Sequence, residues 1–290
     1  MKLPDTVRLE AGQGGLQRVV VETPQADAEI YLHGAHVTHF QPRGQKLVLF
    51  MSEKSSFEPG KPIRGGIPIC FPWFGARQDG REGPAHGFAR LHEWELVSAG
   101  QKEDGAVTLG FRFISNAATR ELWDEEFELT YAIVVGESLT VGLAVRNVSK
   151  KPIRVEEALH TYLSVSDARQ VSIDGLKGVT YSDRVGTPRT ETEGDVPIRI
   201  TAETDRIYMN TQSTCVVHDP GWQRRLVVEK AGSDSTVVWN PWIAKAKAMP
   251  DFGDDEWPSM LCVETCNVRE HGITLSPGQS HTMGAVIRTE

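Results

Sequence analysis

The sequence is poor in the features that would place a protein in a membrane or outside the cell. Its 290 residues contain only four cysteines. Its longest stretch without Asp, Glu, Lys or Arg, His271–Ile287, is interrupted by Ser276-Pro277-Gly278 and is too broken for a membrane helix. The first ten residues, MKLPDTVRLE, carry charges where a signal peptide has its apolar core. We therefore expect a cytoplasmic protein with reduced thiols and no membrane partner.

Positive charge is also scarce. The 31 Lys and Arg residues are outnumbered by 39 Asp and Glu residues, which leaves a net charge of −8. A nucleic-acid-binding protein presents a basic face, so we expect no nucleic-acid partner. The same balance still allows a small anionic ligand to be held by two or three local arginines. There is no G-x-S-x-G, no Walker loop and no Rossmann glycine run, which argues against the common hydrolase, nucleotide-binding and dinucleotide-binding classes.

What the sequence does contain is a two-residue hydrophobic period. Every second residue of LTVGLAV, residues 139–145, is aliphatic, a pattern typical of a half-buried strand. The 27 glycines and 16 prolines punctuate the chain between such segments, so the pattern predicts an all-β fold, a large antiparallel sandwich. The other strand-like segments are QRVVVE, EIYL, AVTLGFRF, FELTYAIVV, RVEEALHTYLSV, TCVVH, RRLVVE, STVVW and HTMGAVIRT.

The organisation of the chain points to one unit. No low-complexity linker and no fixed-period repeat is present, so we expect residues 1–290 to form a single domain. Helical pattern is scarce, and only Asn116–Trp123 predicts one or two turns. Two segments, 61–90 and 239–257, interrupt the strands with Gly, Pro and aromatic residues. Long ordered loops of this kind usually carry binding sites, although they could also simply cap the sandwich.

The segment around His160 predicts a strand with two unlike faces. Alternation over residues 155–165 places the aliphatic residues on one face and His160, Tyr162 and Ser164 on the other. If the second face is concave, His160 points into a polar cleft beside a phenol. The pattern alone favours the alternative, a solvent-facing histidine on an outer strand.

Glu264 lies in the strand-like segment MLCVETC, where it shares one face with Cys262 and Cys266. Two thiol neighbours indicate partial burial, which would disfavour the charged carboxylate and suit a general base. A cross-strand salt bridge to Lys or Arg is equally compatible with the pattern. Four residues of strand separate the two cysteines by about 13 Å, too far for one disulfide or one zinc ion. We therefore expect no metal site.

Two arginines bracket the first long loop. Arg64 precedes Gly65-Gly66, where the missing side chains would allow a ligand close to the backbone, and Arg90 ends the segment HGFAR. Two guanidinium groups can hold a phosphate through paired hydrogen bonds. Each arginine could instead pair with one of the many acidic side chains.

Six segments occur together in a recognisable order and spacing: IRGGIPICFPWFG, HGFAR, ALHTYLSV, TDRIY, VVWNPW and MLCVETCNV. In this combination the chain resembles the hexose-6-phosphate mutarotases, or glucose-6-phosphate 1-epimerases, over residues 15–288. These form a branch of the aldose 1-epimerase, or galactose mutarotase-like, superfamily. The resemblance implies a β-supersandwich that binds a sugar across its concave face.

The resemblance also implies roles for individual residues. His160 of the ALHTY segment matches the family's general acid, and Glu264 of the CVET segment matches its general base. Arg64 and Arg90 match contacts on the phosphate side of the substrate. Asp205 of the TDRIY segment matches the carboxylate that holds a sugar hydroxyl.

One position departs from the pattern of some members. Ala85 stands immediately before HGFAR, where eukaryotic members commonly carry a glutamine that contacts the substrate. That contact is therefore in question here, and the neighbouring His86 is a candidate to replace it.

The reaction that the resemblance implies is the interconversion of the α and β anomers of hexose 6-phosphates, with glucose 6-phosphate as the first expectation. Acid/base ring opening and reclosure is redox-neutral, so we expect no cofactor. We also expect a small sugar phosphate as partner and a monomer. Two alternatives remain: a mutarotase for unphosphorylated aldoses, and a non-catalytic sugar-binding module on the same sandwich. The presence of both His160 and Glu264 speaks against the module.

Overall fold

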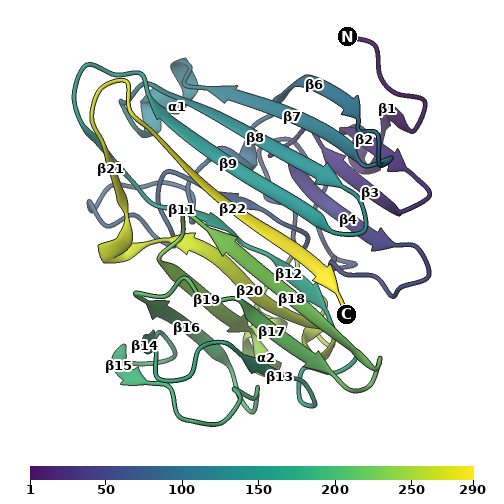
Figure 1. The fold of residues 1–290 in the computed structure, drawn as a ribbon. Helices are drawn as coiled ribbons and strands as arrows, with labels where there is room; N and C mark the ends of the chain where they lie inside the picture. Colours follow the sequence, from purple (N-terminus) through teal and green to yellow (C-terminus); the bar gives the residue numbers. More distant parts are fainter.

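The structure is a computed structural model that describes residues 1–290, and strands make up most of its regular elements (Figure 1). Neighbouring strands pair antiparallel in every sheet, as in the ladder between β8 (Phe127–Val135) and β9 (Leu139–Asn147). The antiparallel all-β fold predicted from the two-residue period is therefore confirmed. No helix of the structure is long and apolar enough to cross a membrane.

The strands form four sheets. The N-terminal sheet has the order β1-β2-β3-β4, with β1 Val7–Ala11, β2 Gln17–Glu22, β3 Ala26–Tyr31 and β4 His36–Pro42. The first eight-stranded sheet, which we call the long sheet, has the order β13-β17-β18-β22-β9-β8-β7-β6. Its other bounds are β6 Glu95–Gln101, β7 Val107–Ile114, β13 Ser172–Asp174, β17 Cys215–Asp219, β18 Arg224–Ala231 and β22 Ser280–Thr289.

The second eight-stranded sheet, which we call the site sheet, has the order β15-β14-β16-β19-β20-β11-β5, and β12 also pairs with β20. Its bounds are β5 Ile69–Cys70, β11 Glu157–Leu159, β12 Tyr162–Ser164, β14 Thr180–Asp183, β15 Arg189–Thr192, β16 Thr204–Met209, β19 Ser235–Asn240 and β20 Met260–Asn267. A two-stranded sheet pairs β10 (Ile153–Val155) with β21 (Ile273–Leu275).

Helices are few and short. The helix α1 spans Ala117–Leu122, and the Asn116 side chain accepts a hydrogen bond from the Thr119 N–H at its start, so the short helix predicted here is confirmed. The helix α2, Trp242–Ala248, was not predicted. Single 3-10 turns cover Gln13–Gly15, Ala89–Leu91, Trp257–Ser259 and Arg269–His271.

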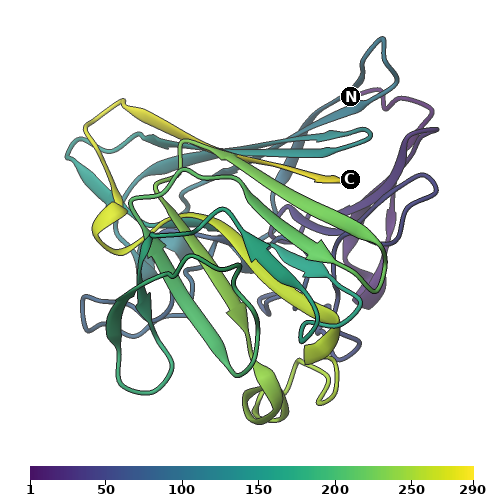
Figure 2. The same ribbon diagram turned by 60° about the horizontal axis from the view of Figure 1, so that its bottom comes forward.

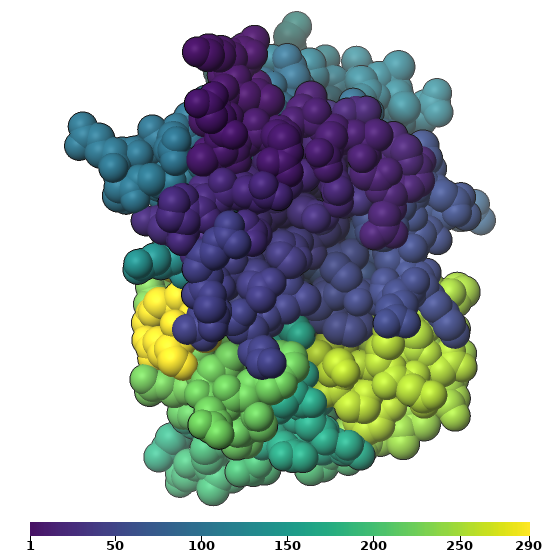
Figure 3. Space-filling view, turned by 90° about the vertical axis from the view of Figure 1, so that its right-hand side faces the viewer, coloured from purple at the N-terminus to yellow at the C-terminus, as the bar shows by residue number.

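Two clusters of buried side chains occupy opposite faces of the site sheet. The larger, of 56 residues, takes in the N-terminal sheet, the long sheet and one face of β20, including Leu261 and Val263. The smaller, of 15 residues, includes Cys262 and Cys266. Glu264 alternates with Val263 and so shares the face of the smaller cluster, as predicted. Figures 1 and 2 show how the sheets are arranged, and in Figure 3 the dark-blue segments that follow the N-terminal sheet lie between the purple N-terminal residues and the green and yellow C-terminal ones.

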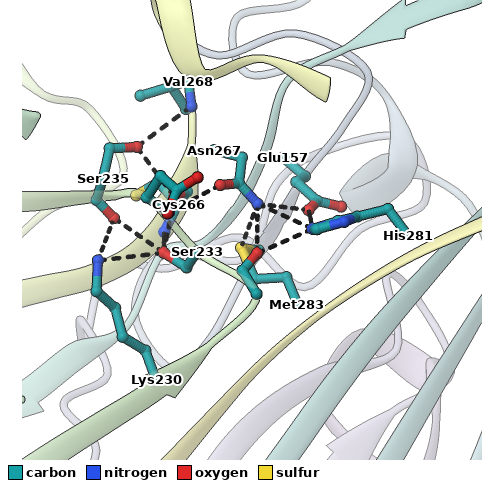
Figure 4. A network of polar contacts seen from close by, with 11 residues as sticks. Glu157, Lys230, Ser233, Ser235, Cys266, Asn267, Val268, His281 and Met283 are labelled. Atoms are coloured by element: carbon teal, nitrogen blue, oxygen red, sulfur yellow. Dashed lines mark hydrogen bonds and ion pairs between the residues drawn. The ribbon is translucent and has the colours of Figure 1, made fainter. Parts of the chain in front are cut away.

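A polar network crosses the layers behind β20 (Figure 4). Its contacts converge on Asn267, the last residue of β20, and it includes Glu157, a fully buried carboxylate on β11. Asn267 donates to Oε1 of Glu157 at 2.9 Å, and His281 Nε2 of β22 lies 3.3 Å from the same oxygen. The hydrogen bond with Glu157 raises the pKa of His281 above its usual 6.5. The pair thereby joins the site sheet to the long sheet.

This pair should make stability depend on pH. A histidine whose pKa is raised by folding contributes stability that is complete below its unfolded pKa and disappears as the pH rises through its folded pKa. We expect His281→Gln to lower the free energy of unfolding by about 1 kcal/mol at pH 6, a modest value because the side chain is 25% exposed to solvent. At pH 9 His281 is neutral in the wild type as well, so the loss should be smaller. Urea unfolding at both pH values measures this. A difference that stays the same across the two pH values would contradict it.

Candidate active site

The position of the site follows from strand register. Leu159 of β11 pairs with Thr265 of β20, and Tyr162 of β12 pairs with Cys262. Counting along the two antiparallel segments, His160 stands opposite Glu264, in the gap between β11 and β12. The continuous strand predicted for residues 155–165 is therefore wrong, because the ladder breaks at the position where His160 meets its partner.

His160 and Glu264 form a buried pair. Nε2 of His160 lies 3.4 Å from Oε1 of Glu264, and the residues are 6% and 1% exposed. The solvent-facing histidine favoured by the pattern is thus wrong, and so is a salt bridge from Glu264 to Lys or Arg. The His160 ring stacks on Tyr162 with centroids 4.8 Å apart. Oε2 of Glu264 is buried and has no hydrogen-bond partner in the protein.

Burial shifts both pKa values of the pair in opposite directions. It raises the pKa of Glu264 well above its usual range, and the nearby carboxylate of Asp205 adds to this effect. It lowers the pKa of His160 well below 6.5, with further contributions from His86 and Arg90. An uncharged carboxylic acid beside a neutral imidazole is therefore the state of the pair that the surroundings favour.

The pair faces a cavity of about 390 Å³. The structure brings together all six residues predicted for the site, although they come from distant parts of the sequence. Besides Arg64, His86, Arg90, His160, Asp205 and Glu264, the lining includes Phe74, Gly75, Gln78, Ala85, Arg184, Trp239, Lys245, Met249 and Arg269.

Arg90 is a buried cation without an anionic partner. The residue is 7% exposed, and its only side-chain hydrogen bond is donated from Nη2 to the Ala85 carbonyl at 2.8 Å. Its Nε is buried and unpaired, and it forms no ion pair, so the alternative of an acidic partner is wrong for Arg90. Burial lowers the pKa of this guanidinium. A buried charge is normally paired, so the cavity is suited to an anion here.

Arg64 is differently placed. Its guanidinium forms an ion pair with Asp251 at 3.0 Å and donates to the Tyr162 hydroxyl at 2.9 Å, so the acidic-partner alternative holds for this arginine. The two following glycines do not admit a ligand to the backbone. A Cβ atom on Gly65 would lie 2.4 Å from the Phe50 carbonyl oxygen, and one on Gly66 would lie 2.2 Å from that of Val37. They allow chain segments to approach each other, and both have positive φ.

Asp205 lies on β16, the second strand from β20 in the site sheet, and lines the same cavity. Burial raises its pKa, and Lys245 and Arg184 oppose that rise. The sequence analysis singled out neither of these cations, nor Arg269. Lys245 lies within the segment 239–257 that interrupts the strand pattern, which is the signal that could have found it. Arg184 and Arg269 follow strands and carry no motif of their own.

One group near the cavity could hold a metal ion. Ligand atoms of His160, Cys262 and Glu264 all lie within 4.8 Å of one another. The prediction that no metal site exists was argued from the spacing of the cysteines and from a reaction that needs no metal, and it did not consider this set. The four cysteines are all unpaired thiols.

Comparisons with known proteins agree with the fold. The crystal structure of a "putative mutarotase" from Salmonella typhimurium matches with a TM-score of 0.92 at 30% identity, over 99% of this chain and 95% of that one. A galactose mutarotase-like protein from Clostridium acetobutylicum matches over 98% of each chain with a TM-score of 0.75, at 13% identity, and so shares the fold. The galactose mutarotase-like fold implied by the resemblance is confirmed.

The sequence comparisons are more specific. The profile of the aldose 1-epimerase family matches residues 17–288. A "putative glucose-6-phosphate 1-epimerase" of Cenchrus ciliaris is 37% identical over 274 residues, which cover 91% of this chain and 82% of that protein. A protein of the same name from Escherichia coli K12 is 36% identical over 256 residues, covering 88% and 84%. The chain belongs to the aldose 1-epimerase family.

Proposed function

We propose that the protein interconverts the α and β anomers of hexose 6-phosphates, with glucose 6-phosphate as its preferred substrate. The observation that carries the proposal is the buried His160–Glu264 pair beside Arg90, a buried cation with no partner. An acid/base pair supplies the chemistry, and the unpaired guanidinium supplies a reason for an anionic sugar. The names of the curated relatives point in the same direction.

The mechanism uses two proton transfers. The Glu264 carboxylate takes the proton of the O1 hydroxyl, and the His160 imidazolium gives a proton to the ring oxygen, so that the C1–O5 bond breaks. Rotation about C1–C2 and the reverse transfers close the ring on the other face. After both transfers Glu264 and His160 are uncharged, which is the state that burial favours. Burial therefore disfavours the ionised pair from which ring opening starts and favours the uncharged pair that ring opening produces.

A second candidate is a mutarotase for unphosphorylated aldoses. The Arg64–Asp251 ion pair favours it, because this arginine already has a carboxylate and needs no phosphate. In that case the role of Arg90 would be electrostatic only: its positive charge limits how far burial raises the pKa of Glu264.

Anomer exchange measured by NMR with glucose 6-phosphate and with glucose distinguishes the candidates. We expect the protein to accelerate anomer exchange of glucose 6-phosphate more than that of glucose. Equal acceleration of exchange for the two sugars would support the second candidate. If the protein accelerates neither reaction, the non-catalytic sugar-binding module is the remaining alternative.

The proposed chemistry needs no metal, in spite of the cluster of His160, Cys262 and Glu264. Both transfers are made by the two side chains, and no oxidation occurs. We therefore expect turnover to be unchanged after exhaustive treatment with EDTA and with dithiothreitol, measured by the same exchange assay. Loss of turnover in EDTA that added zinc or magnesium restores would show that this expectation is wrong.

A further inference from the structure

His86 lines the cavity in a backbone conformation that side chains seldom adopt. Its φ is +63°, in the left-handed region, and its N–H donates to the Gly75 carbonyl at 2.7 Å. The ring meets Phe74 edge-on with centroids 4.7 Å apart and lies 5.5 Å from the His160 ring. Backbone strain of this kind at a cavity wall indicates that the placement of the ring matters.

Two donors converge on Nδ1 of this ring. The Gly75 N–H points at Nδ1 from 3.4 Å, and the Cys70 Sγ lies 3.5 Å from the same atom. A backbone N–H can only donate, so Nδ1 accepts, and the proton of the neutral ring is on Nε2. Burial raises the pKa of Cys70 to about 12, so the thiol keeps its proton and donates as well.

The loop that carries Gly75 is itself fixed. The buried carboxylate of Glu156 accepts the Phe74 N–H at 2.8 Å through one oxygen and the Arg269 N–H at 2.6 Å through the other. Gly75 follows Phe74 in the chain, so these hydrogen bonds also fix the direction of the Gly75 N–H, which points at Nδ1 of His86.

The other nitrogen of the ring is free for a ligand. Nε2 of His86 makes no hydrogen bond within the protein, and the residue lines the cavity. Burial lowers the pKa of His86 well below 6.5, and Arg90, Arg64 and Arg269 lower it further, so the ring stays neutral. A neutral ring with a proton on Nε2 offers a single donor to an oxygen of the ligand.

We infer that Cys70 is a positioning residue that, together with the Gly75 amide, fixes His86 as the Nε2–H tautomer. His86 then acts as a neutral hydrogen-bond donor to an oxygen of the sugar. The inference rests on the proposed function only for the choice of substrate in the kinetic assay.

Nitrogen NMR tests the tautomer without any substrate. Long-range ¹H–¹⁵N spectra of the labelled wild-type protein should show His86 with an unprotonated Nδ1 and a protonated Nε2. Cys70→Ala leaves only the long 3.4 Å contact from the Gly75 N–H, so it should move both ¹⁵N shifts part of the way toward those of a tautomer mixture. Cys70→Ser, which keeps a donor, should restore them. The control Cys215→Ala removes another buried thiol, on β17 and outside the cavity lining, and should leave the His86 signals unchanged.

Kinetics provide the second readout. Loss of one neutral hydrogen bond should raise KM for glucose 6-phosphate in Cys70→Ala by roughly three- to tenfold, with kcat within about twofold, because positioning concerns binding rather than proton transfer. Cys70→Ser should recover most of this loss.

Three results would overturn the inference: a protonated Nδ1 in the wild type, unchanged spectra and kinetics in Cys70→Ala, or a serine variant no better than the alanine one. The last would show that the thiol acts through its volume. If the wild type does not act on glucose 6-phosphate, the proposed function fails, whereas the nitrogen spectra still decide the role of Cys70.

Discussion

Glu264→Gln and His160→Ala are each expected to reduce turnover to less than a tenth of the wild-type value. One positioned proton transfer typically contributes about 10² to 10⁴-fold, and glutamine, although nearly the same size as glutamate, cannot accept the O1 proton. The two transfers belong to one reaction, so the double variant should be only slightly slower than the slower single variant. Exchange NMR with glucose 6-phosphate measures all three rates.

The chain offers a matched control for this experiment. Glu157 is also a fully buried glutamate and lies on β11, the strand that pairs with β20, but it does not line the cavity. Glu157→Gln should therefore keep most of the turnover while it weakens the contact with His281. If Glu264→Gln behaves like Glu157→Gln, or either site variant keeps more than about a tenth of wild-type turnover, the assigned role is wrong.

Arg64→Gln/Arg90→Gln is expected to lose roughly two or more decades in kcat/KM for glucose 6-phosphate. The loss for glucose should be smaller, because it comes only from the influence of the two arginines on the His160–Glu264 pair. Each charge-assisted contact contributes about 1.5–3 kcal/mol, and 1.4 kcal/mol corresponds to tenfold. The phosphate is far from the anomeric carbon, so its contacts should bind the sugar rather than move protons. High salt should reproduce little of the loss, because Arg90 is buried and salt screens buried charges much less than exposed ones. Steady-state kinetics on both sugars measures the selectivity.

The single variants should also differ in stability. Arg64→Gln leaves the Asp251 carboxylate without its partner and should lower the melting temperature. Arg90→Gln removes a buried charge that has no partner, so it should leave the melting temperature unchanged or raise it. Arg43→Gln, at an exposed arginine paired with Asp27, is the control that should affect neither sugar. An equal loss on both sugars in the double variant would favour the free-aldose candidate.

Much of the fold could be predicted because a two-residue period is a local property of the chain. The period also predicted that Glu264 shares a face with Cys262 and Cys266, which the structure confirms. It could not show which face of the sheet is covered, and for that reason the burial of His160 was missed. The break between β11 and β12 was missed because it depends on pairing with β20, a strand about a hundred residues further along the chain.

Other parts of the site depend on long-range contacts in the same way. The sequence shows that Arg64 and Arg90 are arginines, but only the fold brings Asp251 to the first and leaves the second unpaired. Gly65 and Gly66 were read as an opening for a ligand, whereas they accommodate neighbouring backbone. No local pattern marks Arg269 as a residue of the cavity wall.

The residues proposed for chemistry and those proposed for recognition of the phosphate sit on different kinds of structure. His160 and Glu264 face each other across paired strands, whereas Arg64, His86 and Arg90 belong to the connection that runs on either side of the two-residue strand β5. A side-chain substitution at Arg64, His86 or Arg90 leaves the backbone ladder of β20 in place, whereas an insertion near Pro68 would disturb the site, because the Pro68 carbonyl accepts the His160 N–H at 3.0 Å. Over evolution, or in the laboratory, such a protein can therefore change which sugar it accepts while inheriting an unaltered way of opening the ring.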